Sequence, residues 1–282
     1  MKLHWLKPVV SSEQMPFINN QDAKIYWDEQ GTGEPLLLIM GLGYPSVMWF
    51  RTRPLLAQNY RTIALDNRGV GRSDTPPGPY PISLMAADAA AVLDAAGVES
   101  AHVYGVSMGG MIAQEFTLQY PNRVRSLILG CTAPGGPHAV RAEADVIAFL
   151  MQRQAGKEEA LEAAVPFIYD PNTPRHLIDE DIAMRRNWLP KQEAYIAQLQ
   201  GILAWEAYSR LDQIRVPTLV IHGETDRLIP CANSKLIAER IPGARLQLLP
   251  NAGHIYTTDQ MELAQHALQE FLAKETSFSA SQ

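Results

Sequence analysis

Residues 105–110 read Gly-Val-Ser-Met-Gly-Gly, and this stretch decides the fold. A short apolar run precedes it, and a segment with helical character, residues 108–119, follows it. A serine in a G-x-S-x-G pattern between a strand and a helix is typical of a nucleophile elbow, a sharp turn that projects the hydroxyl from a sheet. The glycines on both sides leave room for that turn. The Gly and Ser content predicts only about 0.06 accidental matches, so Ser107 is predicted to be a nucleophile.

Working outward from this motif, short apolar runs alternate with helical patterns. Strands that are apolar on both faces are typical of a mostly parallel sheet covered by helices. The alternation therefore predicts an α/β fold with a doubly wound, mostly parallel sheet. We expect buried strands at residues 36–40, 62–65, 101–106, 124–129, 218–221 and 246–249, and helices at 83–97, with Ser83 as its N-cap, at 108–119 and at 261–274.

The rhythm of strands and helices stops in the middle of the chain. Residues 134–210 contain no strong strand pattern and read as helices at 139–155, 157–169, 176–188 and 191–208. We interpret residues 134–210 as a helical cap inserted into a core made of residues 1–133 and 211–282. Two separate domains are the alternative, which is less favoured because the C-terminal part offers only two strands, too few for a sheet of its own.

The composition of the chain argues against some classes of function. The 282 residues carry a net charge of −6, with 46% hydrophobic and 19% charged residues, which is typical of a globular chain and lacks the basic excess of a nucleic-acid-binding protein. We expect no membrane association, since the apolar runs are far shorter than the ~20 residues that span a bilayer. The N-terminal segment does not resemble a signal peptide, so a cytoplasmic protein is expected, with Cys131 and Cys231 as reduced thiols.

A nucleophilic serine needs a base and an acid that orients the base. In a chain with this elbow the expected order is serine, acid, histidine. His254 follows the strand predicted at 246–249 and is the expected base. Glu224 and Asp226 lie on the loop after the preceding strand, and Asp226 is preferred because its side chain is shorter and it lies deeper in the loop.

An oxyanion hole requires two backbone N–H groups, one from the residue after the nucleophile and one from the loop after an earlier strand. We assign these donors to Met108 and Leu42. Aromatic side chains suggest an apolar substrate pocket between cap and core. The expected pocket residues are Trp49, Phe50, Trp188, Trp205, Tyr208 and Tyr256.

Other chemistries find little support. The sequence has no H-E-x-x-H pattern, no Cys or His pair at zinc spacing and no Walker loop. Residues 69–71, Gly-Val-Gly, lack the third glycine of a dinucleotide fingerprint and are interpreted as a structural turn. We therefore expect no metal site and no cofactor.

Together these residues resemble the α/β-hydrolase fold superfamily. Residues 105–114, GVSMGGMIAQ, look most like the esterase and 3-oxoadipate enol-lactonase branch, and the resemblance covers roughly residues 14–134 and 211–274. It implies a helical cap over the active site. Other matching segments are residues 37–43, 66–74, 123–129, 222–230 and 251–254.

Three positions separate this chain from parts of that superfamily. Met40 stands where many relatives have a histidine that supports the oxyanion turn. Ile255 follows His254 where relatives that cleave carbon–carbon bonds often have a tryptophan. Ser107 differs from the aspartate nucleophile of dehalogenases and epoxide hydrolases.

The expected function is therefore hydrolysis of a carboxylic ester or lactone through an acyl-enzyme on Ser107. Its partner is a small, largely apolar molecule, and the protein is a monomer or homodimer. The alternatives are a carbon–carbon bond hydrolase, a cofactor-free perhydrolase, and a ligand receptor that retains the triad. If the surroundings of His254 are ordinary, activity rises with pH near 6.5.

Overall fold

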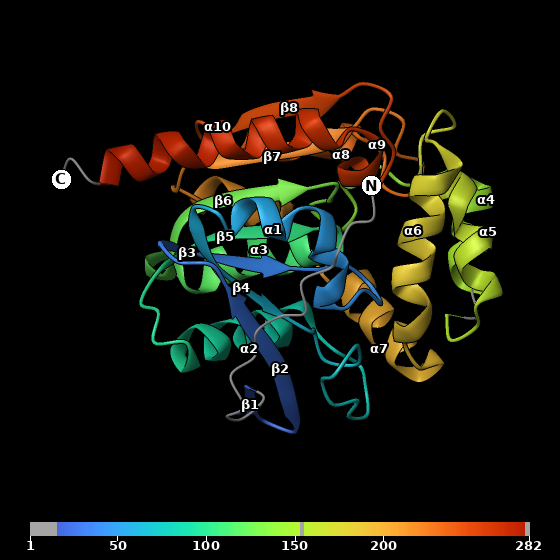
Figure 1. The fold of residues 1–282 in the computed structure, drawn as a ribbon, viewed down its shortest axis with the longest axis horizontal. Coiled ribbons are helices and arrows are strands. Elements are labelled where there is room, and N and C mark those ends of the chain that lie inside the picture. Colours follow the sequence, from blue (N-terminus) through green and yellow to red (C-terminus); the bar gives the residue numbers. More distant parts are fainter. Residues whose placement is uncertain (1–15, 153–154, 280–282) are drawn as a thin grey trace, which may run out of the picture.

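A computed structural model describes residues 16–152 and 155–279. Its centre is an eight-stranded sheet in the order β1-β2-β4-β3-β5-β6-β7-β8 (Figure 1). The strands β3 to β8 are parallel, whereas β1 and β2 run antiparallel to their neighbours. The bounds are β1 Phe17–Asn20, β2 Ala23–Gln30, β3 Glu34–Ile39, β4 Tyr60–Leu65, β5 Ala101–Val106, β6 Val124–Gly130, β7 Thr218–Gly223 and β8 Arg245–Leu249. The predicted mostly parallel α/β sheet is confirmed.

Helices cover both faces of this sheet, which explains the continuous apolar runs. Along β3, Leu37 and Ile39 enter the core beneath α2 and α3, whereas Leu36 and Leu38 enter the core beneath α1 and α10. A strand buried on both faces needs apolar residues at successive positions. The helices of the core are α1 Arg53–Leu56, α2 Ile82–Ala95, α3 Met108–Gln119, α8 Ala232–Arg240, α9 Tyr256–Asp259 and α10 Met261–Ser279, with short 3₁₀ helices at Ser46–Arg51, Pro121–Arg123 and Tyr208–Gln213.

The edges of the sheet differ from the sequence-based expectation. The strands β1 and β2 were not expected, because their sequences FINN and AKIYWDEQ mix polar and apolar residues and their side chains differ in exposure along each strand. At the other edge, β8 was expected to be buried, but most of its side chains are accessible and Leu246 is 39% exposed. Edge strands have one neighbour and need less apolar surface.

Helix α2 begins earlier than expected. The Pro81 carbonyl accepts hydrogen bonds from the N–H groups of Leu84 and Met85, so Pro81 is the N-cap and Ser83 already lies in the first turn. The predicted end is confirmed, because the helix stops before Gly97, which adopts φ +66°.

Four helices lie between β6 and β7, at the end of the sheet to which the parallel strands point (Figure 1). We call α4–α7 the insertion. Its helices are shorter than expected: α4 is Ala144–Gln152, α5 Glu159–Ile168, α6 Arg175–Arg185 and α7 Gln192–Leu203, with a 3₁₀ turn at Arg186–Trp188. An apolar cluster of its own, which includes Leu161, Ile178 and Ile182, holds α5 and α6 together.

No helix in the described part of the chain is long and apolar enough to cross a membrane. The N-terminal segment that was judged unlike a signal peptide lies outside the described residues.

Candidate active site

Ser107 occupies a strained turn between β5 and α3. Its backbone angles are φ 57° and ψ −123°, a conformation that L-residues rarely adopt and that often marks functional sites. The crowding that requires glycine is explicit: a Cβ on Gly105 would lie 2.1 Å from the Gly109 carbonyl oxygen, and one on Gly109 would lie 2.1 Å from the Ile39 carbonyl oxygen. The Ser107 N–H donates to the Gly130 carbonyl at 2.8 Å. Local sequence therefore produces the turn, and neighbouring strands hold it.

His254 and Asp226 meet although they are 28 residues apart. The distance between His254 Nδ1 and Asp226 Oδ2 is 2.7 Å, and the two residues are only 7% and 6% exposed. Glu224 is exposed, so the structure brings Asp226 and not Glu224 to the histidine. Ile229 N–H donates to the other carboxylate oxygen of Asp226 at 2.9 Å, which fixes the plane of the carboxylate.

Electrostatics favour the charged forms of this pair. Burial by itself raises the pKa of Asp226, but the positive charge of His254 and hydrogen bonds from His222 and His254 lower that pKa to about 2. Burial by itself lowers the pKa of His254, but the charge of Asp226, assisted by hydrogen bonds to Asp226 and Cys131, raises it well above 6.5. The surroundings of His254 are therefore not ordinary, and the acid limb of activity expected near 6.5 moves to higher pH.

His222 is a second histidine on the same carboxylate. Its Nε2 lies 2.9 Å from both Asp226 Oδ2 and the Ile229 carbonyl oxygen, and its Nδ1 lies 2.5 Å from Ser234 Oγ. A carbonyl oxygen only accepts, so Nε2 carries the proton and donates to Asp226. Sequence analysis assigned no role to His222, although its position at the end of a strand next to the acid loop was an available signal.

Asp259 ties the histidine loop to the insertion. Its carboxylate accepts from Gly253 N–H at 2.7 Å, Asp170 N–H at 3.2 Å and Thr173 Oγ1 at 2.7 Å. Burial raises the pKa of Asp259 to about 6, although these hydrogen bonds oppose the shift. Sequence analysis did not identify Asp259, because two of its three partners, Asp170 and Thr173, come from a loop more than 80 residues earlier.

The loop after β3 lies directly against Ser107. A Cβ on Gly41 would be 3.4 Å from Ser107 Oγ. Tyr44 N–H donates to the Gly41 carbonyl at 3.1 Å, and Gly43 has φ +69°, which together are typical of a type II turn with Leu42 and Gly43 at its centre. Met108 is the first residue of α3, where a helix leaves N–H groups unpaired. Leu42, which follows Gly41, and Met108, which follows Ser107, are thus potential oxyanion donors.

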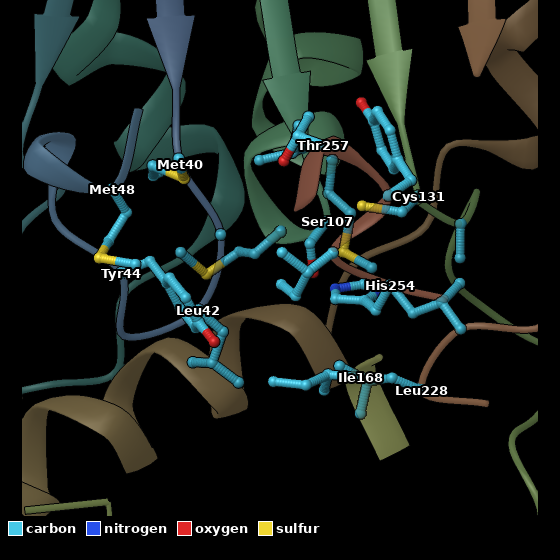
Figure 2. A pocket seen from close by; sticks show the side chains of 18 of the residues that line it. Met40, Leu42, Tyr44, Met48, Ser107, Cys131, Ile168, Leu228, His254 and Thr257 are labelled. Carbon is cyan, nitrogen blue, oxygen red and sulfur yellow. The ribbon is translucent and has the colours of Figure 1, made fainter. Parts of the chain in front are cut away.

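A cavity opens above these residues, between the core and the insertion (Figure 2). It encloses about 1360 Å³, including the space at its open mouth, and both Ser107 and His254 line it. Most of the other lining side chains are apolar. The core contributes the sulfur-containing side chains of Met40, Met48, Met108, Met111 and Cys131. The insertion contributes Leu150, Ile168, Leu199 and Ile202, and the acid loop contributes Leu228 and Ile229. Such a surface suits an apolar ligand.

The six predicted pocket aromatics separate into two groups. Trp49, Phe50 and Tyr256 line the cavity. The other three lie elsewhere: Trp205 donates from Nε1 to Glu115 at 2.8 Å, Tyr208 stacks on the His138 ring, and Trp188 packs against the Arg72 guanidinium. The sequence placed these three in the insertion or at its end but carried no information about which way they face.

Arg51 is the cationic side chain of the lining, and it is neutralised. Its Nε donates to Asp181 at 2.8 Å and a terminal nitrogen donates to Glu180 at 3.0 Å. Asp181 also accepts from Tyr169 and Thr258. This buried network holds α6 against the core. Within the residues that the structure describes, no group of three or more His, Cys, Asp or Glu side chains has the arrangement of a metal site, and Cys131 and Cys231 are free thiols.

Comparison with known proteins agrees with this geometry. The model of a family described as alpha/beta hydrolase fold matches residues 34–256. "Putative carbamate hydrolase RutD" of Azorhizobium caulinodans is 34% identical over 246 residues, which cover 86% of this chain and 92% of that protein.

A second curated protein and a solved structure are also similar to this chain. The poly(3-hydroxyalkanoate) depolymerase of Ectopseudomonas oleovorans is 32% identical over 244 residues, covering 86% of this chain and 85% of that protein. Among solved structures, Est816, described as an N-acyl homoserine lactone degrading enzyme, superposes with a TM-score of 0.78 at 28% identity, covering 91% of this chain and all of the other.

Proposed function

The chain belongs to the α/β-hydrolase fold family, and we propose that it is a serine hydrolase that cleaves esters or lactones with an apolar acyl group. The observation that carries this proposal is the strained Ser107 at the floor of an apolar cavity that His254, paired with Asp226, also lines. In this reading residues 134–210 are a cap over the core formed by residues 1–133 and 211–282. The similarity to a poly(3-hydroxyalkanoate) depolymerase and to Est816, described as an N-acyl homoserine lactone degrading enzyme, supports the proposal.

The proposed reaction has two halves. Ser107 Oγ attacks the carbonyl carbon while His254 Nε2 takes its proton, and the N–H groups of Leu42 and Met108 stabilise the oxyanion. His254 then donates the proton to the leaving alcohol, which leaves an acyl-enzyme on Ser107. A water molecule then attacks the acyl carbon while His254 takes one of its protons, and His254 returns that proton to Ser107 Oγ as the acid product departs. Asp226 holds the imidazole in the required orientation throughout.

Carbamate hydrolysis is a second candidate because of the relation to RutD. A carbamate ester presents the same kind of carbonyl to Ser107. A small anionic carbamate is less favoured, because Arg51 is already paired with Asp181 and Glu180 and the remaining lining is mostly apolar.

The test is steady-state hydrolysis of p-nitrophenyl esters of increasing acyl length, of a lactone series and of a p-nitrophenyl carbamate. We expect turnover of the esters or lactones to fall at least about 10⁴-fold in Ser107→Ala and to stay unchanged in Ser83→Ala, a matched control at an exposed position. Turnover of the carbamate alone would favour the second candidate. Hydrolysis that persists in Ser107→Ala would contradict the serine mechanism.

A further inference from the structure

One buried side chain of the insertion holds the turn on which the proposed oxyanion hole depends. Gln198, on α7, is 0% exposed and accepts a hydrogen bond at its Oε1 from Gly43 N–H at 2.9 Å. Its Nε2 donates to the Arg68 carbonyl at 2.8 Å. The two contacts join the insertion to two separate loops of the core.

The orientation of this amide is determined by its partners. A backbone N–H only donates and a carbonyl only accepts, so the Gln198 oxygen must face Gly43 and its nitrogen must face Arg68. The Arg68 carbonyl is itself well placed, because the Arg68 side chain is 1% exposed and makes two hydrogen bonds of 2.7 Å to buried Asp88. The Gln198 side chain is therefore held at both ends of its amide, by Gly43 and by Arg68.

Gly43 is adjacent to the residue that matters for catalysis. It forms the centre of the 41–44 turn together with Leu42, and its φ of +69° is the conformation that a type II turn requires at that position. The preceding end of the turn is held separately, since Asn67 Nδ2 donates to the Met40 carbonyl at 2.9 Å. The Met40 side chain has no N–H or O–H group with which to support the turn. Gln198 thus holds the far end of the turn.

We propose that Gln198 is a positioning residue that aims the Leu42 N–H at the oxyanion, so that the oxyanion hole is complete only when α7 is seated on the core. This inference rests on the proposed function, because it assigns the hole a role in acyl transfer. Gln198 contacts neither Ser107 nor His254 and acts through the Gly43 peptide. The insertion accordingly contributes to the chemical step as well as to the wall of the cavity.

The test compares Gln198→Met and Gln198→Asn with Gln200→Met, a matched control at an exposed position two residues further along α7. Met keeps the length of the side chain but makes neither bond, and Asn keeps the amide but is too short to reach both partners. We expect kcat on the best p-nitrophenyl ester to fall about 5- to 30-fold in the Gln198 variants, with KM within about twofold of wild type. The affinity for phenylboronic acid, which forms a tetrahedral adduct on serine, should fall by the same factor.

A double-mutant cycle identifies the path of the effect. Leu42→Pro removes the Leu42 N–H at a turn position that accepts proline, and it should lower kcat about 100-fold or more. Leu42→Ala keeps the N–H and measures the part of the loss that comes from the leucine side chain alone, which lines the cavity. On the Leu42→Pro background, Gln198→Met should change kcat less than about twofold, because the group that it positions is gone.

Two results would overturn the inference alone: an unchanged kcat in folded Gln198 variants whose thermal stability is lower, or an equal loss with and without Leu42→Pro. Either outcome would make Gln198 a purely structural link between α7 and the core. Wild-type hydrolysis that does not depend on Ser107 would instead overturn the proposed function, and this inference with it.

Discussion

Replacing Asp226 by Asn tests the electrostatic design of the site most directly. One carboxylate oxygen accepts from both His254 and His222, and the other accepts from Ile229 N–H. An asparagine must present its NH₂ group to one of these two sides. Facing Ile229, it opposes another donor; facing the histidines, it forces His254 into the tautomer that carries its proton on Nε2 and cannot accept the proton of Ser107.

The magnitude follows from these two effects. The wrong tautomer at a triad histidine lowers kcat by about 10⁴-fold, which corresponds to roughly 5 kcal/mol of transition-state stabilisation. The variant also removes the charge that raises the pKa of His254. Since His254 is only 7% exposed, its burial still disfavours the charged form, and its pKa falls from that of the wild type.

The assay is kcat/KM on one p-nitrophenyl ester from pH 5 to pH 9. His254 must be neutral to act as a base, so activity rises with pH through its pKa. We expect the acid limb of the wild type above pH 6.5, and the acid limb of Asp226→Asn at a lower pH than that of the wild type. Glu224→Gln removes an exposed carboxylate from the same loop and should leave both the rate and the limb unchanged.

The reasoning fails if Asp226→Asn loses less than about tenfold in kcat/KM, or if its acid limb stays where that of wild type lies. An equally large loss in Glu224→Gln would show that the loop as a whole, rather than the Asp226 carboxylate, supports the histidine.

Three further results are expected. Gly105→Ala should lower the free energy of unfolding, measured by urea titration, by at least about 3 kcal/mol, because its Cβ would lie 2.1 Å from the Gly109 carbonyl oxygen. Gly97→Ala is the control, because a Cβ at Gly97 would have no atom within 4 Å. It should lower the free energy of unfolding by about 1 kcal/mol. Asp259→Asn should flatten the dependence of Tm on pH. Because the native pKa of Asp259, about 6, exceeds the ordinary value of 3.8, this carboxyl adds stability to the wild type as the pH falls from 7 to 4, by at most about 3 kcal/mol. Parallel Tm profiles of the two proteins would contradict this reasoning. His222→Phe removes a hydrogen bond to Asp226 and should raise the pKa of that carboxyl from about 2, which a ¹³C NMR titration of the Asp226 carboxyl measures; an unchanged value would exclude the proposed support.

The sequence by itself determined the features that depend on neighbouring residues or on a strong pattern. The elbow at residues 105–110 could be recognised locally, because one of its constraints lies within the motif: a Cβ on Gly105 would meet the Gly109 carbonyl oxygen four residues later. The strands β3 to β7 could be predicted because burial on both faces requires continuous apolar runs. The order of Ser107, Asp226 and His254 along the chain was enough to propose the triad, since strands and loops of this fold follow in a known sequence.

Tertiary structure alone decided the contacts between segments far apart in the chain. The strand β1 at the edge of the sheet and its neighbour β2 depend on pairing rather than on composition. The sequence around Trp205 does not show which way its side chain faces. Only the packing of the chain directs its indole N–H to Glu115. In the sequence, Gln198 is an ordinary polar residue of a helix. Only the tertiary structure shows that it accepts a hydrogen bond from Gly43, 155 residues earlier. Periodicity shows which side of a helix is buried, but not what lies against it, because the partner is chosen by the packing of the whole chain.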